Sequence, residues 1–84
     1  MTIAKKLMDL FSWAMDDKPN YGAVLSEIEY TGLSPFITRK LIKSKMRTLT
    51  LFTKEENKFV MVYLAFKGNG KFVKDYAEYE EKLI

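Results

Sequence analysis

Thr31-Gly32-Leu33-Ser34-Pro35 carries the strongest structural signal in this 84-residue sequence. Gly32 can adopt the left-handed backbone conformation that turns a chain sharply after a helix. Ser34 suits the N-cap of a following helix, and Pro35 suits its first turn, where a missing N–H costs nothing. The stretch therefore predicts two helices joined by a tight turn, with Leu33 buried in the angle between them.

Helices are predicted on both sides of this turn, and another helix precedes them. Thr2 can cap a first helix whose apolar residues recur at intervals of three and four; they are Ile3, Leu7, Leu10, Phe11 and Ala14. Pro19 cannot continue that helix. A second, short helix is predicted over about residues 23–30, and a third runs from Ser34 to about Lys45.

After the third helix the pattern changes to the two-residue period of a β-strand. Leu49 and Leu51 alternate with threonines, polar residues 54–58 follow, and residues 59–66 form the longest β-prone run. These segments predict two strands that form a hairpin. Residues 71–84 predict a final helix with its apolar positions on one face: Phe72, Val73, Tyr76, Tyr79 and Leu83.

The predicted fold class is therefore α+β, with a three-helix core, a two-stranded β-hairpin wing and a C-terminal helix. A chain of this length forms a single domain, here residues 1–84. The order of elements resembles that of small, stand-alone archaeal winged helix-turn-helix transcriptional regulators, a type frequent on viral and plasmid genomes. The segments that carry the resemblance are Leu25-Ser26-Glu27-Ile28, Thr31-Gly32-Leu33-Ser34-Pro35, Tyr63-Leu64 and the turn at residues 67–71 before Phe72.

The resemblance implies sequence-specific binding of double-stranded DNA in the regulation of transcription. In a helix-turn-helix the second helix enters the major groove, and the wing is expected on the DNA backbone. Arg39 is expected to read a base, because its planar guanidinium can donate twice to guanine. Lysines suit phosphates better. The candidate DNA-binding residues are Ser34, Phe36, Thr38, Arg39, Lys40, Lys43, Lys45, Arg47, Lys54, Asn57 and Lys58.

The distribution of charge agrees with this placement. The whole chain has a formal net charge of +3, but residues 34–58 contain seven Lys or Arg residues against Glu55 and Glu56 alone. The predicted last helix is mainly acidic, which makes it a poor surface for DNA.

A homodimer is expected from the same last helix. Its C-terminal part would extend past so small a core, so its apolar face is expected to pair with a second copy, although it could instead cover the chain's own core. The first helix, which carries Trp13, could share the interface. A two-fold dimer would bind a pseudo-palindromic target. The candidate interface residues are Phe72, Tyr76, Tyr79 and Leu83.

Composition limits the other functions. The chain has no Cys and no His, so disulfides, zinc fingers and imidazole catalysis are excluded. We expect no enzyme activity, no cofactor and no metal. No apolar run of about 18 residues and no signal peptide is present, which predicts a cytoplasmic protein, in the host cytoplasm if a virus or plasmid encodes it. Two alternatives stay open: a winged-helix module for protein–protein interaction, and a non-specific architectural DNA-binding protein.

Overall fold

The first helix begins where the sequence predicts it. In the computed structural model, which describes residues 2–84, α1 spans Ile3–Asp17, and the Thr2 hydroxyl accepts a hydrogen bond from the Lys5 N–H at 3.1 Å. Lys18 caps the end of the helix in a left-handed conformation, directly before Pro19. One stripe of α1 is buried, and its residues recur at intervals of three and four: Ala4, Leu7, Leu10 and Ala14.

The second helix and its turn also follow the prediction. α2 spans Tyr21–Tyr30, and the Asn20 side chain accepts from the Ala23 N–H at 2.8 Å. Gly32 has a φ of +77°, the left-handed region that favours glycine. The next residue, Leu33, donates its N–H to the Ile28 carbonyl at 2.8 Å and is fully buried. The chain therefore turns sharply after α2, as the glycine predicts.

Beyond this turn the chain forms a four-stranded antiparallel sheet, with strand order β1-β2-β3-β4. The strands are β1 (Ile37–Lys43), β2 (Met46–Glu55), β3 (Lys58–Lys67) and β4 (Glu78–Leu83). β2 and β3 pair along their whole length, so the predicted hairpin is confirmed and is longer than expected. Short 3-10 turns, η1 (Ser34–Phe36) and η2 (Lys74–Tyr76), precede β1 and β4.

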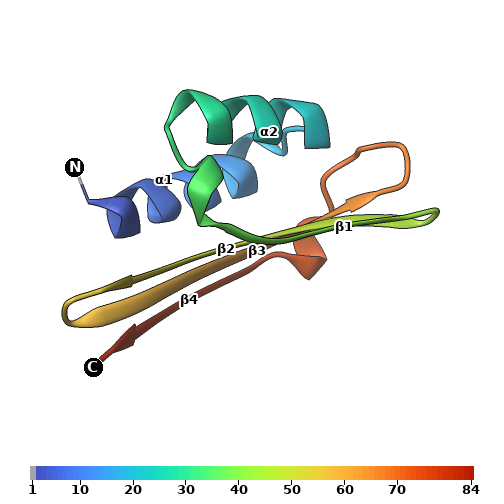
Figure 1. Cartoon of the computed structure of the whole chain (residues 1–84). Coiled ribbons are helices and arrows are strands. Elements are labelled where there is room, and N and C mark those ends of the chain that lie inside the picture. Colours follow the sequence, from blue (N-terminus) through green and yellow to red (C-terminus); the bar gives the residue numbers. More distant parts are fainter. Residues whose placement is uncertain (1) are drawn as a thin grey trace.

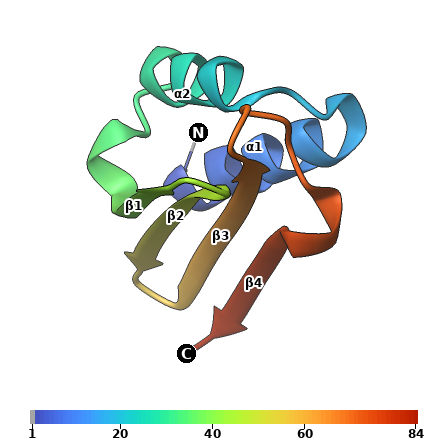
Figure 2. The ribbon, with the colours of Figure 1, turned by 90° about the vertical axis from the view of Figure 1, so that its right-hand side faces the viewer.

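Both helices lie on the same side of the sheet, which makes a structure of two layers (Figure 1). The core lies between α1, α2 and the side chains that β2 and β3 direct toward them. Phe66 is fully buried there, with its ring centroid 5.3 Å from Tyr21 and 5.7 Å from Phe72. The segment after β3 rises to the beginning of α2, where the Tyr21 N–H donates to the Gly70 carbonyl at 2.8 Å (Figure 2).

The predicted third helix is wrong. A helical turn does begin here, but Ser34 is its first residue and not its N-cap, the turn stops after three residues, and residues 37–43 form β1. Two physical reasons account for this. Ile37, Thr38 and Ile42 are β-branched, which lowers helix propensity and raises strand propensity. The free edge of β2 also offers a full set of backbone hydrogen bonds, which β1 satisfies.

The predicted C-terminal helix is wrong as well, so the winged helix-turn-helix fold is overturned. Residues 71–84 form an isolated bridge between Phe72 and Phe66, then η2, then β4, which pairs with β3. Individually, residues such as Glu80, Glu81 and Lys82 favour helix. Pairing with the second edge of β3 outweighs that preference, because β3 would otherwise expose a long row of unpaired backbone groups.

Candidate functional site

The alternation of side chains gives the sheet two different faces. One face carries Leu49, Leu51, Val60, Val62 and Leu64, all fully buried beneath the helices. The opposite face, here called the open face, has neither helix packed on it (Figure 1). Its residues, assigned from the strand register, are Arg39, Leu41 and Lys43 of β1; Met46, Thr48, Thr50, Phe52 and Lys54 of β2; Phe59, Met61, Tyr63, Ala65 and Lys67 of β3; and Glu78, Glu80 and Lys82 of β4.

The open face carries the whole charge excess of the protein. It has five basic side chains, which are Arg39, Lys43, Lys54, Lys67 and Lys82, against Glu78 and Glu80. This excess of three positive charges equals the formal net charge of the whole chain, +3. The remainder of the molecule is therefore balanced in charge. All seven of these charged residues are exposed to solvent.

Aromatic side chains lie among these charges. Phe52 and Phe59 stack diagonally across β2 and β3, with ring centroids 5.8 Å apart and an interplanar angle of 30°. The Lys54 ammonium lies 5.4 Å from the centroid of the Phe59 ring, within the range of a cation–π contact. Phe52 remains 36% exposed, although it is one of the largest apolar side chains. Tyr63, two residues beyond Met61 on β3, is partly buried on the same face.

A shallow hollow of about 330 Å³ opens beside this aromatic pair. Phe52, Phe59 and Met61 form its apolar lining, and Glu80 and Lys82 of β4 complete it. An apolar lining with a few polar groups is the usual composition of a site for a small ligand or for one group of a larger one.

Three of the residues predicted to bind DNA belong to the open face: Arg39, Lys43 and Lys54. They lie there as outward residues of strands and not as one face of a helix. β1 alternates, so Lys40, between Arg39 and Leu41, points to the helix side of the sheet. The basic segment of the sequence is therefore divided between two faces.

The other predicted DNA-binding residues are dispersed. Ser34 is exposed in η1, whereas Phe36 packs against the core. The Thr38 hydroxyl donates to the Thr50 carbonyl at 3.3 Å, and Lys45 lies in the turn between β1 and β2. The Arg47 guanidinium lies 5.2 Å from the Tyr21 ring centroid, and Lys58 pairs with Glu81 at 3.7 Å. Asn57 lies in the turn between β2 and β3, where its backbone carbonyl accepts from the Ile84 N–H.

The residues predicted to form a dimer interface do not share one surface. Phe72 is buried in the core, and Tyr76 is 59% exposed in η2. Tyr79 packs with its ring centroid 5.5 Å from that of Phe11, and Leu83 is exposed near the C-terminus. The helix assigned to dimerisation is absent, so the predicted homodimer stays a prediction without an assigned surface.

A larger hollow, of about 590 Å³, lies between α1 and α2. Its lining mixes Trp13 and Leu10 with one lysine and two carboxylates, Asp9 and Glu27. Lys6, the lysine, already donates to the Thr31 carbonyl at 2.9 Å. Of the two carboxylates, Asp9 is already paired with Lys5 at 2.8 Å. The lining therefore offers no set of polar groups that points to a particular ligand, and the open face is the stronger candidate.

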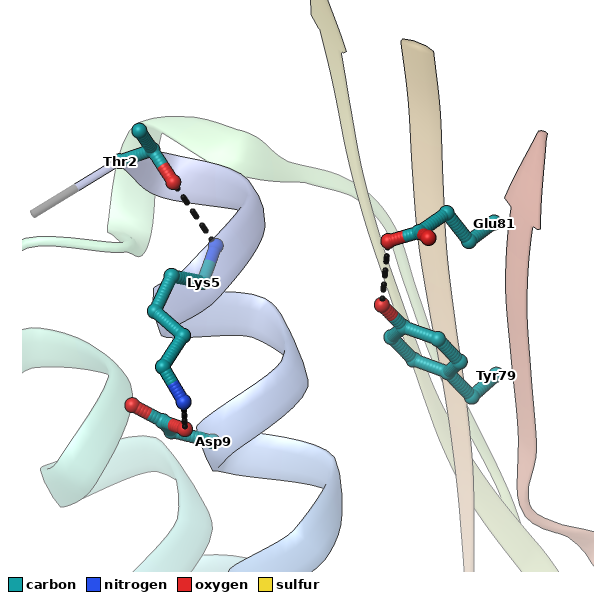
Figure 3. A network of polar contacts seen from close by, with 5 residues as sticks. All are labelled: Thr2, Lys5, Asp9, Tyr79 and Glu81. Carbon is teal, nitrogen blue, oxygen red and sulfur yellow. Dashed lines mark hydrogen bonds and ion pairs between the residues drawn. The ribbon is translucent and has the colours of Figure 1, made fainter. Parts of the chain in front are cut away.

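The side chain of Tyr79, in β4, has a shifted pKa. Tyr79 donates its hydroxyl hydrogen to the Glu81 carboxylate at 3.2 Å (Figure 3). Burial, followed by this bond and the negative charge of Glu81, raises the pKa of Tyr79 above the usual value of a tyrosine. Tyr79 therefore stays neutral over the physiological range, and it lies on the helix side of the sheet, away from the open face.

Comparison of the chain with protein-family models, curated proteins and solved structures finds no match. Across residues 2–84, no helix is long and apolar enough to cross a bilayer. In the same part of the chain, no three acidic, His or Cys side chains gather where a metal ion could bind.

The sequence prediction missed the aromatic residues of the open face, although a signal for them exists. Along β3 the inward positions Val60, Val62 and Leu64 are aliphatic, whereas two of the outward positions, Phe59 and Tyr63, are aromatic. In β2, Phe52 falls at an outward position between the inward residues Leu51 and Thr53. Large aromatic residues at the outward positions of two neighbouring strands indicate a surface with a function beyond packing.

Proposed function

We propose that this protein binds single-stranded nucleic acid on the open face of its sheet. The observation that carries the proposal is the position of Phe52, Phe59 and Tyr63 on the one sheet face that holds the chain's entire charge excess. Aromatic side chains among basic ones are the recurring composition of single-strand binding surfaces. A cytoplasmic location, expected from the sequence, is kept as part of this proposal.

Unpaired bases account for the aromatic residues. A base can stack on an exposed phenyl ring, and each such stack contributes about 1–3 kcal/mol to binding. Within a duplex the bases stack on one another, so their faces are out of reach of side chains on a protein surface. The partly exposed rings on the open face therefore favour a single strand as the ligand.

The width of the sheet also argues against a duplex. Four strands at a spacing of about 4.8 Å give a sheet about 14 Å wide before side chains are added. The major groove, about 12 Å wide, admits a helix or a two-stranded ribbon. The basic hairpin of β1 and β2 is not a free ribbon, because β3 pairs with β2 as far as Met46. The helix expected to enter the major groove is absent, because residues 37–43 form β1, so we propose a single strand on the sheet as the ligand.

Charge disfavours a second copy of the chain as the occupant of this face. Two open faces packed against each other would bring two surfaces of net charge +3 together. A phosphate backbone has the opposite charge; Lys54 lies beside the aromatic pair, and Arg39 and Lys43 lie farther along the same face on β1. Phosphates can therefore bind these side chains while bases contact the rings.

The test is fluorescence anisotropy of a labelled 12-nucleotide single strand of mixed sequence, as RNA and as DNA, with an unlabelled duplex as competitor. Phe52→Ala should weaken binding about 5- to 100-fold, the equivalent of one lost base stack. Tyr30→Ala is the matched control, because Tyr30 is 87% exposed on α2, far from the open face. It should leave the affinity unchanged.

A second pair of variants tests the charge. Lys43→Ala removes a basic side chain from the open face, whereas Lys40→Ala removes an exposed one from the other side of the same strand. Lys43→Ala should lower the slope of log affinity against log salt by about 0.7, the value for one phosphate of a single strand. Equal effects of the two lysine variants, or tighter binding of the duplex than of the single strand, would contradict the proposal.

A further inference from the structure

The hollow beside Phe59 has a polar wall whose chemistry is specific. Glu80 lies opposite Met61, and Lys82 lies opposite Phe59, both on the open face. They are two residues apart, so their Cα atoms are separated by about 6.7 Å along β4. The ion pairs found among residues 2–84 join Lys5 to Asp9 and Lys58 to Glu81, so neither Glu80 nor Lys82 is paired. Both are free to bind a ligand.

A carboxylate can only accept hydrogen bonds, and an ammonium group can only donate them. A ligand that satisfies both must present donors to Glu80 and an acceptor to Lys82. A phosphate does not meet this condition, because it has no donor for Glu80 and is repelled by that carboxylate. The hollow therefore suits a base, and its volume of about 330 Å³ is at the lower end of the range for ligand sites.

Among the common bases, guanine meets the condition best. Its Watson–Crick edge presents two adjacent donors, N1–H and the N2 amino group, followed by the acceptor O6. Adenine and cytosine each present one amino group beside an acceptor, and uracil and thymine present one N–H between two carbonyls. A carboxylate that receives two parallel hydrogen bonds gains strength and geometric selectivity over one that receives a single bond.

We infer that the hollow takes a guanine base of the bound single strand. Phe59 and Phe52 contact the face of the base, Glu80 accepts from N1 and N2, and Lys82 donates to O6. This inference rests on the proposed single-strand binding and adds a base preference to it. The strand would then bind with one guanine at β3 and β4 and with its backbone toward the basic residues of β1 and β2.

The test uses 9-nucleotide uridine strands whose central residue is guanosine, adenosine, cytidine, uridine or inosine, measured by fluorescence anisotropy. The guanosine strand should bind about 5- to 100-fold more tightly than the adenosine, cytidine and uridine strands, the range for one bidentate base contact. Inosine, which lacks the N2 amino group, should bind between guanosine and uridine. One guanosine per strand prevents the formation of four-stranded guanine structures.

Two isosteric variants separate the role of Glu80 from that of charge alone. Glu80→Gln should reduce the guanosine preference to within about two-fold, because one of its two acceptor oxygens becomes an amino group. Glu78→Gln removes the same charge from the same strand but opposite Tyr63, outside the hollow, and should keep the preference. Circular dichroism of both variants checks that the fold is unchanged.

The outcomes distinguish the two proposals. Equal affinity for the five strands, with binding still weakened by Phe52→Ala, would overturn the guanine site and leave single-strand binding in place. A preference that persists in Glu80→Gln would also overturn it. Absence of binding to every strand would overturn both proposals.

Discussion

The same substitution on opposite faces of the sheet should have very different effects on stability. Phe66→Ala removes a fully buried ring that contacts Tyr21 and Phe72, whereas Phe52→Ala removes a ring that is 36% exposed on the open face. A buried Phe→Ala change costs about 3–5 kcal/mol, because it leaves a cavity as well as removing apolar burial. The two aromatic contacts of Phe66 place it toward the upper end of that range.

The smaller effect of Phe52→Ala follows from its exposure. Full burial of a Phe side chain contributes about 1.5–3 kcal/mol, and about two thirds of Phe52 is buried, which gives about 1–2 kcal/mol. No closed cavity forms at an open surface. An 84-residue domain is stable by about 4–13 kcal/mol, so Phe66→Ala should remove a large share of that stability and Phe52→Ala a small one.

Urea denaturation measures both effects. Unfolding is detected by far-ultraviolet circular dichroism and by the fluorescence of Trp13, the single tryptophan. With a slope of about 1 kcal/mol per molar urea, the midpoints of the two variants should differ by about 2 M or more. Equal loss of stability in the two variants would refute a structure of two layers, because it would mean that Phe52 is covered as completely as Phe66.

Three further predictions concern the backbone and titration. A Cβ added at Gly68 would collide with the Ser44 carbonyl oxygen, a backbone atom that cannot move aside cheaply, so Gly68→Ala should lower the thermal midpoint. Gly22→Ala, in α2, meets only ordinary contacts and should leave the midpoint unchanged or raise it slightly. Asn20→Ala removes the cap of α2 and should cost about 1 kcal/mol in chemical denaturation. The raised pKa of Tyr79 means that the folded state favours the neutral phenol. Its contribution to the free energy of unfolding is therefore complete below about pH 10 and is lost as the pH rises through the folded-state pKa. Tyr79→Phe should make the free energy of unfolding decline less steeply in that range.

The sequence predicts the first half of the fold well because its signals there are local. Thr2 and Gly32 act through their own turns, and the spacing of apolar residues in α1 is set by the helical repeat. The hairpin of β2 and β3 is also local, since its strands are joined by a two-residue turn. These elements are predictable without knowledge of what packs against them.

The two edge strands are not determined by their own residues alone. Residues 37–43 contain apolar positions that fit a helix or a strand, and residues 78–83 are mostly good helix formers. β1 is decided by the free edge of β2, and β4 is decided by β3, whose outward and inward positions are nearly all apolar. A run of that kind is typical of an interior strand, which needs neighbours beyond a single hairpin. The apolar sequence of β3 therefore already indicated that the sheet has more than two strands.

The candidate site was predicted only in part for the same reason. The basic segment was visible in the sequence, and Arg39, Lys43 and Lys54 do lie on the open face, with Lys43 and Lys54 near opposite ends of β2. Their assignment to a helix obscured the role of Phe52 and Phe59, which become neighbours only through the register of β2 and β3. Strand register is a pairwise property that a single segment does not contain.

The alternation along β2 and β3 has a consequence for how this protein can change over evolutionary time. Every second residue packs in the core, and the residues between them lie on the open face, where most are partly exposed and Ala65 is buried. Substitutions at the outward positions mostly alter stability by less than about 0.5 kcal/mol, apart from the larger rings. Mutation can therefore vary the ligand preference of the open face while the inward positions conserve the fold, so related proteins could share this architecture and differ in what they bind.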